Sequence, residues 1–150
     1  MFLFMAKEMN NRQAYFNYHI EDKYVAGIVL MGTEVKSIRE GKVSFADSYC
    51  QFDKGELWLR GLTIAEYSHG TAYNHVPVHD RKLLLTSREL KRLEAKMKEK
   101  GYTLIPLKVF FNDKNFVKVE IGLARGKKVH DKRESIKERD TQREMKRYLK

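Results

Sequence analysis

The strongest constraint on the fold lies in residues 103–123, where two extended arms flank a short polar turn. In the second arm, from residue 116 onward, apolar residues alternate with Lys118 and Glu120. A repeat of two residues is typical of a half-buried antiparallel strand, because successive side chains point to opposite faces of a sheet. Residues 103–111 are also largely apolar, and residues 112–115 between the arms are polar. The pattern predicts a β-hairpin whose inward residues are Val117, Val119, Ile121 and Leu123.

Other segments predict a second hairpin, a buried strand and two helices. Residues 48–62 suit a hairpin with Gly55 at a positive φ in its turn, and residues 24–31 suit a buried strand. One helix is expected over residues 33–40. A second begins at Thr86, which can form a capping box with Glu89. These elements predict a mainly β fold, a small OB-like antiparallel barrel with one or two flanking helices and a basic C-terminal tail.

Positive charge is distributed unevenly along the chain. The 150 residues include 30 Lys or Arg and 20 Asp or Glu, a net charge of +10. Residues 121–150 hold 11 basic and five acidic residues, and their single aromatic residue is Tyr148. We therefore divide the chain into a packed barrel, residues 1–128, and a basic tail, residues 129–150. Nucleic acid and an acidic membrane surface both fit this charge as partners, and a soluble protein that is merely basic remains open.

Several classes of site lack support in the sequence. The one cysteine, Cys50, cannot form an internal disulfide and is expected to be a small buried residue. Three histidines and an aspartate lie between residues 69 and 80, but Pro77 interrupts them and no second cluster has zinc spacing, so a surface loop is favoured over a metal site. No run has the length of a membrane span or a signal peptide. We expect a cytoplasmic protein with no cofactor, no membrane contact and no catalytic residues.

Aromatic and basic residues are interspersed through the expected barrel, which points to RNA. Unstacked bases can stack on aromatic rings while phosphates meet Lys and Arg. A further basic cluster, residues 125–133, follows the last expected strand. We expect it to form a loop that binds phosphate.

The tail has the pattern of a helix with one basic stripe. On a helical wheel that starts at Lys132, six residues share an arc of about 100°, and the acidic residues of the tail fall outside it. The six are Ile136, Arg139, Arg143, Lys146, Arg147 and Lys150. Such a helix has no apolar stripe to pack within its own protein, and short isolated helices are marginal in water. We expect the tail to be disordered when free and helical beside RNA phosphates.

Several motifs, in order from about residue 10 to the end, resemble the SsrA-binding protein (SmpB) family. The two most specific are Gly32-Thr33-Glu34-Val35-Lys36-Ser37 and Gly126-Lys127-Lys128 with His130-Asp131-Lys132-Arg133. The first of these lies within a longer match over residues 26–42. The others are Asn11-Arg12-Gln13-Ala14, Asp47-Ser48-Tyr49, Arg81-Lys82-Leu83-Leu84-Leu85 and Gly101-Tyr102-Thr103-Leu104-Ile105-Pro106-Leu107.

The resemblance implies an RNA-binding adaptor and not an enzyme. Its barrel would bind the tRNA-like part of transfer-messenger RNA (tmRNA, or SsrA RNA) as a monomer and deliver it to stalled ribosomes for trans-translation. Its tail would enter the small-subunit decoding site and the messenger path. The expected RNA contacts are Asn11, Arg12, Tyr18, Glu34, Lys36, Tyr49, Lys82, Leu84, Thr86, Arg125, Gly126, Lys127 and Lys128. The expected decoding-site residues are His130, Asp131, Lys132, Arg133, Ile136, Arg139, Arg143, Arg147 and Tyr148.

Four positions depart from the pattern of the family. Val25 stands where a Glu associated with RNA binding is usual, and Thr86 stands where Asn or His is usual. His79 replaces a common Arg and so removes a fixed charge at neutral pH. Thr141 stands where some members carry an aromatic residue.

Two alternatives remain open at the level of sequence. A generic ribosome-associated or single-strand RNA-binding OB protein explains the charge and the barrel, but it does not require the stripe in the tail. A small nuclease would need a general base beside a phosphate clamp.

Overall fold

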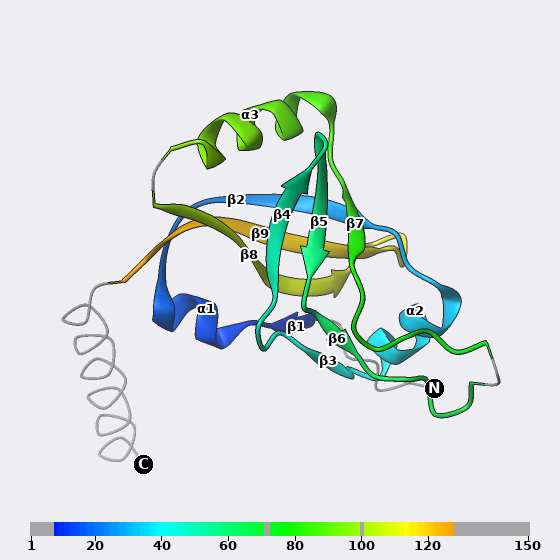
Figure 1. Cartoon of the computed structure of the whole chain (residues 1–150). Coiled ribbons are helices and arrows are strands. Elements are labelled where there is room, and N and C mark those ends of the chain that lie inside the picture. The colour runs from blue at the N-terminus through cyan, green and yellow to red at the C-terminus, as the bar shows by residue number, and fades with distance from the viewer. Residues whose placement is uncertain (1–7, 71–72, 100, 128–150) are drawn as a thin grey trace, which may run out of the picture.

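The wall of the molecule is an antiparallel sheet that curves until it closes on itself (Figure 1). The structure is a computed structural model and describes residues 8–70, 73–99 and 101–127. Around the barrel the strands follow the order β8 (Tyr102–Phe111), β4 (Tyr49–Asp53), β5 (Glu56–Arg60), β7 (Arg81–Leu84), β2 (Tyr18–Ile28) and β9 (Val117–Gly126). The β8–β9 pairing closes the ring, which confirms the expected antiparallel barrel.

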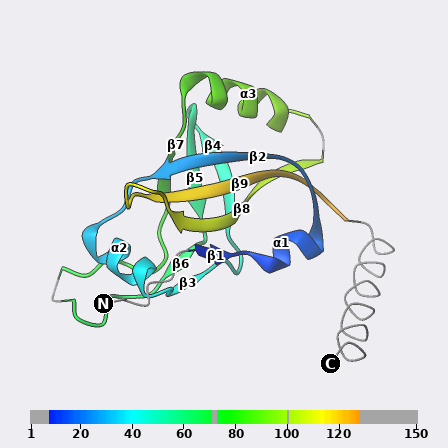
Figure 2. The same ribbon diagram turned by 180° about the vertical axis from the view of Figure 1, so that it is seen from behind.

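Smaller elements flank this ring. Strand β1 (Glu8–Asn10) pairs with residues 108–110 of β8, and β3 (Val43–Ser44) pairs with β6 (Thr63–Ile64) in a separate ribbon. Helix α3 (Ser87–Met97) lies over one end of the barrel, while α1 (Arg12–Asn17) and α2 (Gly32–Arg39) lie toward the other end (Figures 1 and 2). One or two helices were expected, and the described residues contain three. The six-residue α1 has no apolar stripe long enough to reveal it.

Both expected hairpins form, and the inner faces of their strands supply much of the hydrophobic core. Val117, Val119, Ile121 and Leu123 are buried, as their alternation predicts. In the tight turn between β4 and β5, Lys54 and Gly55 have φ of 51° and 78°. Two successive positive φ angles match the right-handed twist of the flanking strands, and this is why Gly suits the second position. Cys50 lies in the same core, and burial raises the pKa of its thiol.

Helix α2 lies within one residue of its expected bounds, and α3 begins at the expected cap, Thr86, but ends at Met97. Helix α2 is followed by Gly41 at a φ of 74°. At α3, the Glu89 amide donates to Thr86 Oγ1 at 3.2 Å, and the Thr86 amide donates to the Glu89 carboxylate at 3.2 Å. This reciprocal capping box satisfies two amides that the first helical turn leaves without partners. The inward Leu93 then joins the core.

Two strands differ from their expected bounds. Strand β2 begins at Tyr18, six residues earlier than expected, and only Ala26 in it is fully buried because its outer face meets solvent. Strand β9 continues to Gly126, so Arg125 and Gly126 belong to a strand and not to the expected phosphate-binding loop. The early start of β2 explains this, since Tyr18 and His19 pair with Gly126 and Arg125. Among the described residues, no helix is long and apolar enough to cross a lipid bilayer.

Candidate nucleic-acid interface

The outer face of the barrel carries a row of side chains from four adjacent strands. Lys118 on β9 pairs with Phe110 on β8 and with Gly27 on β2, and Gly27 pairs with Leu84 on β7. The residues on either side of Lys118 in β9 are buried, so Lys118 faces outward. Leu84 is 49% exposed although it stands in a run of three leucines. The row therefore combines apolar surface with a positive charge.

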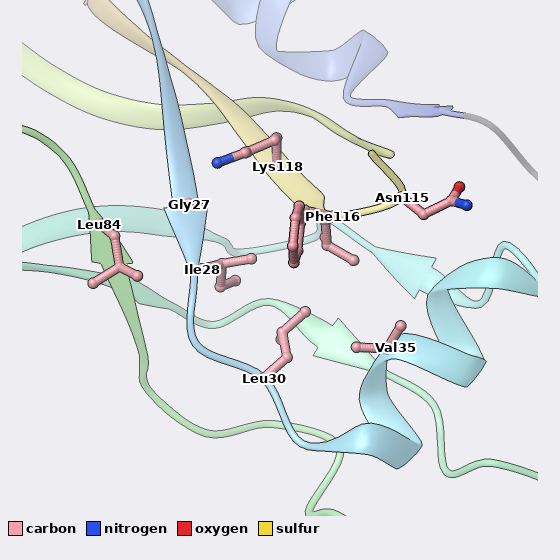
Figure 3. A pocket seen from close by; sticks show the side chains of 9 residues that line it. Gly27, Ile28, Leu30, Val35, Leu84, Asn115, Phe116 and Lys118 are labelled. Carbon is pink, nitrogen blue, oxygen red and sulfur yellow. The ribbon is translucent and has the colours of Figure 1, made fainter. Parts of the chain in front are cut away.

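A hollow of about 360 Å³ opens in this face beside Gly27. A Cβ at position 27 would lie 3.4 Å from the Leu84 Cβ and 3.7 Å from the Lys118 Nζ, so any side chain there would begin to fill the hollow. Figure 3 shows the Lys118 amine pointing toward Gly27 and the Phe116 ring beside Ile28. The Phe116 side chain is 62% exposed. An exposed ring next to an ammonium group offers a stacking surface for a base and a contact for its phosphate.

A second row on the same face sets one carboxylate among lysines. Glu120 pairs with Val25 on β2 and with Lys108 on β8. Its oxygens lie 3.8 Å from the Lys23 Nζ and 4.0 Å from the Lys108 Nζ. Val25, at the position where the family usually has Glu, is 51% exposed. This part of the face thus presents an apolar side chain at position 25 and a carboxylate on the neighbouring strand.

Two expected contacts near this face already have partners within the protein. The Lys82 Nζ lies 3.1 Å from a carboxylate oxygen of Glu56, so an RNA phosphate would compete with that carboxylate. The Thr86 side chain is exposed, but its hydroxyl accepts from the Glu89 amide at the start of α3. Each of these residues lies two positions from Leu84 in the chain, so both lie close to the outer face.

Glu34 does not lie on the surface, contrary to the expectation that it contacts RNA. Its side chain is fully buried and accepts from the Nε of Arg81, which is also buried. Arg81 donates in addition to the carbonyl oxygens of Leu62 at 2.7 Å and Pro77 at 2.9 Å. One buried ion pair therefore ties α2 to β7 and to the segment that precedes β7. Sequence alone could not pair two residues 47 positions apart.

The ionisation of Glu34 is set by these neighbours. Burial by itself would raise the pKa of Glu34, but the Met31 amide and the Arg81 guanidinium outweigh it and hold the pKa below its usual value. His79 Nε2 lies 3.1 Å from the same carboxylate oxygen that Arg81 contacts. His79, which stands where the family commonly has Arg, therefore joins this network from a partly exposed position.

His75 of the 69–80 segment has partners for both of its ring nitrogens. The two ring nitrogens of the buried His75 lie 2.9 Å from Thr33 Oγ1 and 2.9 Å from the Ile64 carbonyl oxygen. Both nitrogens are therefore used to hold the segment against α2 and β6. In the part of the chain that the structure describes, no three His, Cys, Asp or Glu side chains gather in a way that could hold a metal ion.

The remaining expected contacts from the first half of the chain lie elsewhere on the barrel. The Asn11 side chain donates to the Pro106 carbonyl oxygen at 2.8 Å and so fixes the start of α1. Arg12 is exposed beside a hollow of about 300 Å³, and Tyr18 is half-buried. Lys36 lies 5.4 Å from the centre of the Tyr67 ring, and Tyr49 is exposed at the start of β4. Because α1 and α2 lie toward opposite sides in both views, these residues do not form one patch (Figures 1 and 2).

The end of β9 carries the last expected contacts that the structure describes. Arg125 and Gly126 are exposed, and the Lys127 amide donates to the Asn17 carbonyl oxygen at 2.9 Å. Lys128 and all the expected decoding-site residues, from His130 to Tyr148, lie outside the described residues.

Two residues of the hollow were missed as site residues although the sequence held a signal for them. In β9 the outward positions are those of Lys118 and Glu120, and Phe116 shares their parity. Phe116 therefore stands at the outward-facing start of the expected second arm, a position where an aromatic ring can stack on a base. Lys118 has a weaker signal, because a lysine on the outer face of a strand is common.

The comparisons with known proteins agree with this architecture. The family model described as SmpB protein matches residues 8–150. The chain belongs to the SmpB family. It is 54% identical over 140 residues to the SsrA-binding protein of Fervidobacterium nodosum, covering 93% of this chain and 94% of the relative. It is 55% identical over 140 residues to the SsrA-binding protein of Rhizobium johnstonii, covering 93% of each chain.

A solved structure is also similar. It is described as "tmRNA-SmpB: a journey to the center of the bacterial ribosome", and its matching chain is 48% identical to this one. The TM-score is 0.72, with coverage of 87% of this chain and 95% of that chain. The match thus extends the family assignment from sequence to fold.

Proposed function

We propose that this protein is an RNA-binding adaptor that binds the tRNA-like part of tmRNA and delivers it to stalled ribosomes for trans-translation. Membership of the SmpB family supports this role, since its relatives are SsrA-binding proteins. The observation that carries it on the protein itself is the outer face around Gly27, with Phe116, Leu84 and Lys118 around one hollow. The chain contributes binding and positioning, and bond formation belongs to the ribosome.

Within this proposal the RNA contacts are divided by position. Leu84, Phe116 and Lys118 contact the RNA directly on the outer face, with Lys82 and Thr86 at its border. Glu34 acts indirectly, because its ion pair with Arg81 holds α2 and β7 in place. Arg12, Lys36 and Tyr49 contribute at separate places on the barrel.

The tail, residues 129–150, acts in the decoding site and the messenger path of the small subunit. The charge pattern and the helical stripe support this division of labour. One copy of the protein acts per RNA, in the cytoplasm, with no cofactor.

A binding experiment tests the RNA half of the proposal. In gel shifts, the full chain should bind the tRNA-like fragment of tmRNA at least 10-fold more tightly than a single-stranded RNA of equal length. Phe116→Ala should weaken this binding, while Tyr73→Ala, which removes a more exposed ring in the 65–80 segment, should not. Equal affinity for both RNAs would favour the generic single-strand-binding protein instead.

A tagging assay tests the tail. Truncation after Lys128 should keep the affinity for the tRNA-like fragment within about three-fold, because the barrel is intact. The truncated protein should fail to support peptide tagging on stalled ribosomes, because nothing fills the decoding site. Normal tagging by the truncated protein would contradict the role of the tail.

A further inference from the structure

Three side chains from three strands meet where β9 approaches its end. Arg125 on β9 pairs with Tyr102 on β8 and with His19 on β2. Its guanidinium lies over the Tyr102 ring, 4.0 Å from the ring centre, and its Nε lies 3.2 Å from one carboxylate oxygen of Glu21. The Tyr102 hydroxyl donates to the other oxygen of Glu21. Glu21, Tyr102 and Arg125 therefore form a closed ring of contacts, the exit clamp.

Glu21 reaches this position because of an irregularity in β2. The pairing of β2 with β9 passes from Ile20 opposite Ala124 directly to Asp22 opposite Leu123, so Glu21 is an extra residue without a partner in the ladder. A β-bulge of this kind disrupts the ladder locally and redirects the side chain of the extra residue. Here the redirected carboxylate serves Tyr102 and Arg125 together. The bulge thus removes one pairing position from the β2–β9 ladder and allows Glu21 to contact side chains of β8 and β9.

The exit clamp contributes little to global stability. The side chains of Arg125 and Glu21 are 45% and 42% exposed. Ion pairs at such positions contribute little because water screens them. The stacking of Arg125 on Tyr102, together with the contacts that Glu21 makes to both residues, instead constrains the local geometry. This separates the clamp from the buried Glu34–Arg81 pair, which joins α2 to the barrel wall.

The position of the exit clamp in the chain indicates what it constrains. One residue after Arg125, Gly126 still pairs with Tyr18, and the Lys127 amide donates to the Asn17 carbonyl oxygen at 2.9 Å. The segment assigned above to the decoding site begins just beyond. The clamp therefore lies two residues before Lys127, close to the point where that segment begins.

We propose that Glu21 and Tyr102 are positioning residues that act through Arg125 to fix the direction in which the chain leaves the barrel at Lys127. In this view Arg125 anchors the exit and is not primarily a contact for RNA phosphate, because Glu21 already balances its charge. The functional consequence rests on the proposed function: loss of the clamp misdirects the decoding-site segment while the barrel still binds RNA.

Hydrogen exchange tests the structural half without reference to RNA. In Glu21→Ala, the amide of Lys127 should exchange at least 10-fold faster than in the wild type, and the amide of Ile121 in the middle of β9 should not change. Tyr102→Phe keeps the ring under Arg125 but removes the hydroxyl, so it should give a smaller increase. Asp53→Ala, which breaks an exposed pair with Arg60, is the matched control and should leave the Lys127 amide unchanged. An unchanged Lys127 amide in Glu21→Ala would overturn the clamp.

A tagging assay on stalled ribosomes tests the consequence with the same variants. Glu21→Ala should bind the tRNA-like fragment within two-fold of the wild-type Kd but support tagging at least five-fold less well. Asp53→Ala should tag normally. Normal tagging by Glu21→Ala despite a faster Lys127 amide would overturn the functional part of the inference. A wild-type protein that neither binds tmRNA nor tags would refute the proposed function, and hydrogen exchange would still decide whether the clamp exists.

Discussion

The two sides of β7 show how one strand serves two purposes. On the inner side, Arg81 and Leu83 are almost completely buried, and Arg81 holds Glu34 on α2. On the outer side, Lys82 and Leu84 meet solvent beside the hollow at Gly27. The residues alternate along four positions of the chain, so polarity alone does not reveal which are structural. The inner side contains the charge that the fold needs, and the outer side contains an apolar residue that the fold does not need.

The comparison between the two sides of β7 is tested most directly at the buried ion pair of Glu34 and Arg81. Glu34→Gln should lower the free energy of unfolding by about 3–5 kcal/mol, because it leaves the buried Arg81 without its countercharge. Thermal or chemical unfolding followed by circular dichroism measures this. At a temperature where the variant stays folded, its affinity for the tRNA-like fragment should remain near that of the wild type. A stable variant that binds RNA poorly would place Glu34 in the interface after all.

The adjacent leucines sharpen the comparison because they differ only in the side they face. Leu83→Ala should cost about 2–5 kcal/mol of stability, since it leaves a cavity in the core. Leu84→Ala should change stability by less than about 1 kcal/mol and should weaken RNA binding. Melting curves and gel shifts on both variants separate the effects. The division of β7 fails if Leu84→Ala is the more destabilising of the two.

Acidification should weaken the buried ion pair on the inner side of β7. The pKa of Glu34 is lower in the folded protein than its ordinary value of 4.5. A lowered pKa stabilises the fold above about pH 4.5, and this contribution is lost as the pH falls through the folded-state pKa. The difference in Tm between the wild type and Glu34→Gln should therefore be constant from pH 7 to about pH 5 and should shrink at lower pH. A difference that shrinks already between pH 7 and pH 6 would contradict this assignment.

The sequence predicted elements whose signal is local and missed those fixed by distant pairing. The alternation in β9, the capping box at Thr86 and the turn at Gly55 each depend on neighbours in the chain, and all three are confirmed. A barrel was expected, but the pairing of β4 with β8 through Cys50 and Leu104 could not be read from the sequence, because these strands are far apart in the chain. The continuation of β9 to Gly126 depends on the early start of β2, which has no local signal of its own.

The residues of the candidate site also divide into those that the sequence indicated and those that depend on distant pairing. Leu84 and Thr86 were expected as contacts and lie on or beside the outer face. Phe116 and Lys118 complete the hollow only because β9 pairs with β2 across Gly27. Glu34 was assigned to the interface from a motif that the family shares, and a motif does not distinguish a contact from a buried support. The buried ion pair between Glu34 and Arg81, seen in the structure, makes that distinction.

The smallest expected effect concerns a single phosphate contact on the outer side. Lys118→Ala removes one positive charge beside the hollow, while Lys54→Ala removes one from the exposed turn between β4 and β5. When a lysine contacts phosphate, binding releases condensed counterions, and the log–log dependence of affinity on salt becomes steeper by about one unit per contact. The slope for the tRNA-like fragment should therefore be shallower by about one unit in Lys118→Ala and unchanged in Lys54→Ala. Both variants lose the same net charge, so a general change in attraction would affect them equally. Equal slopes in the two variants would remove Lys118 from the interface and leave the hollow without its phosphate contact.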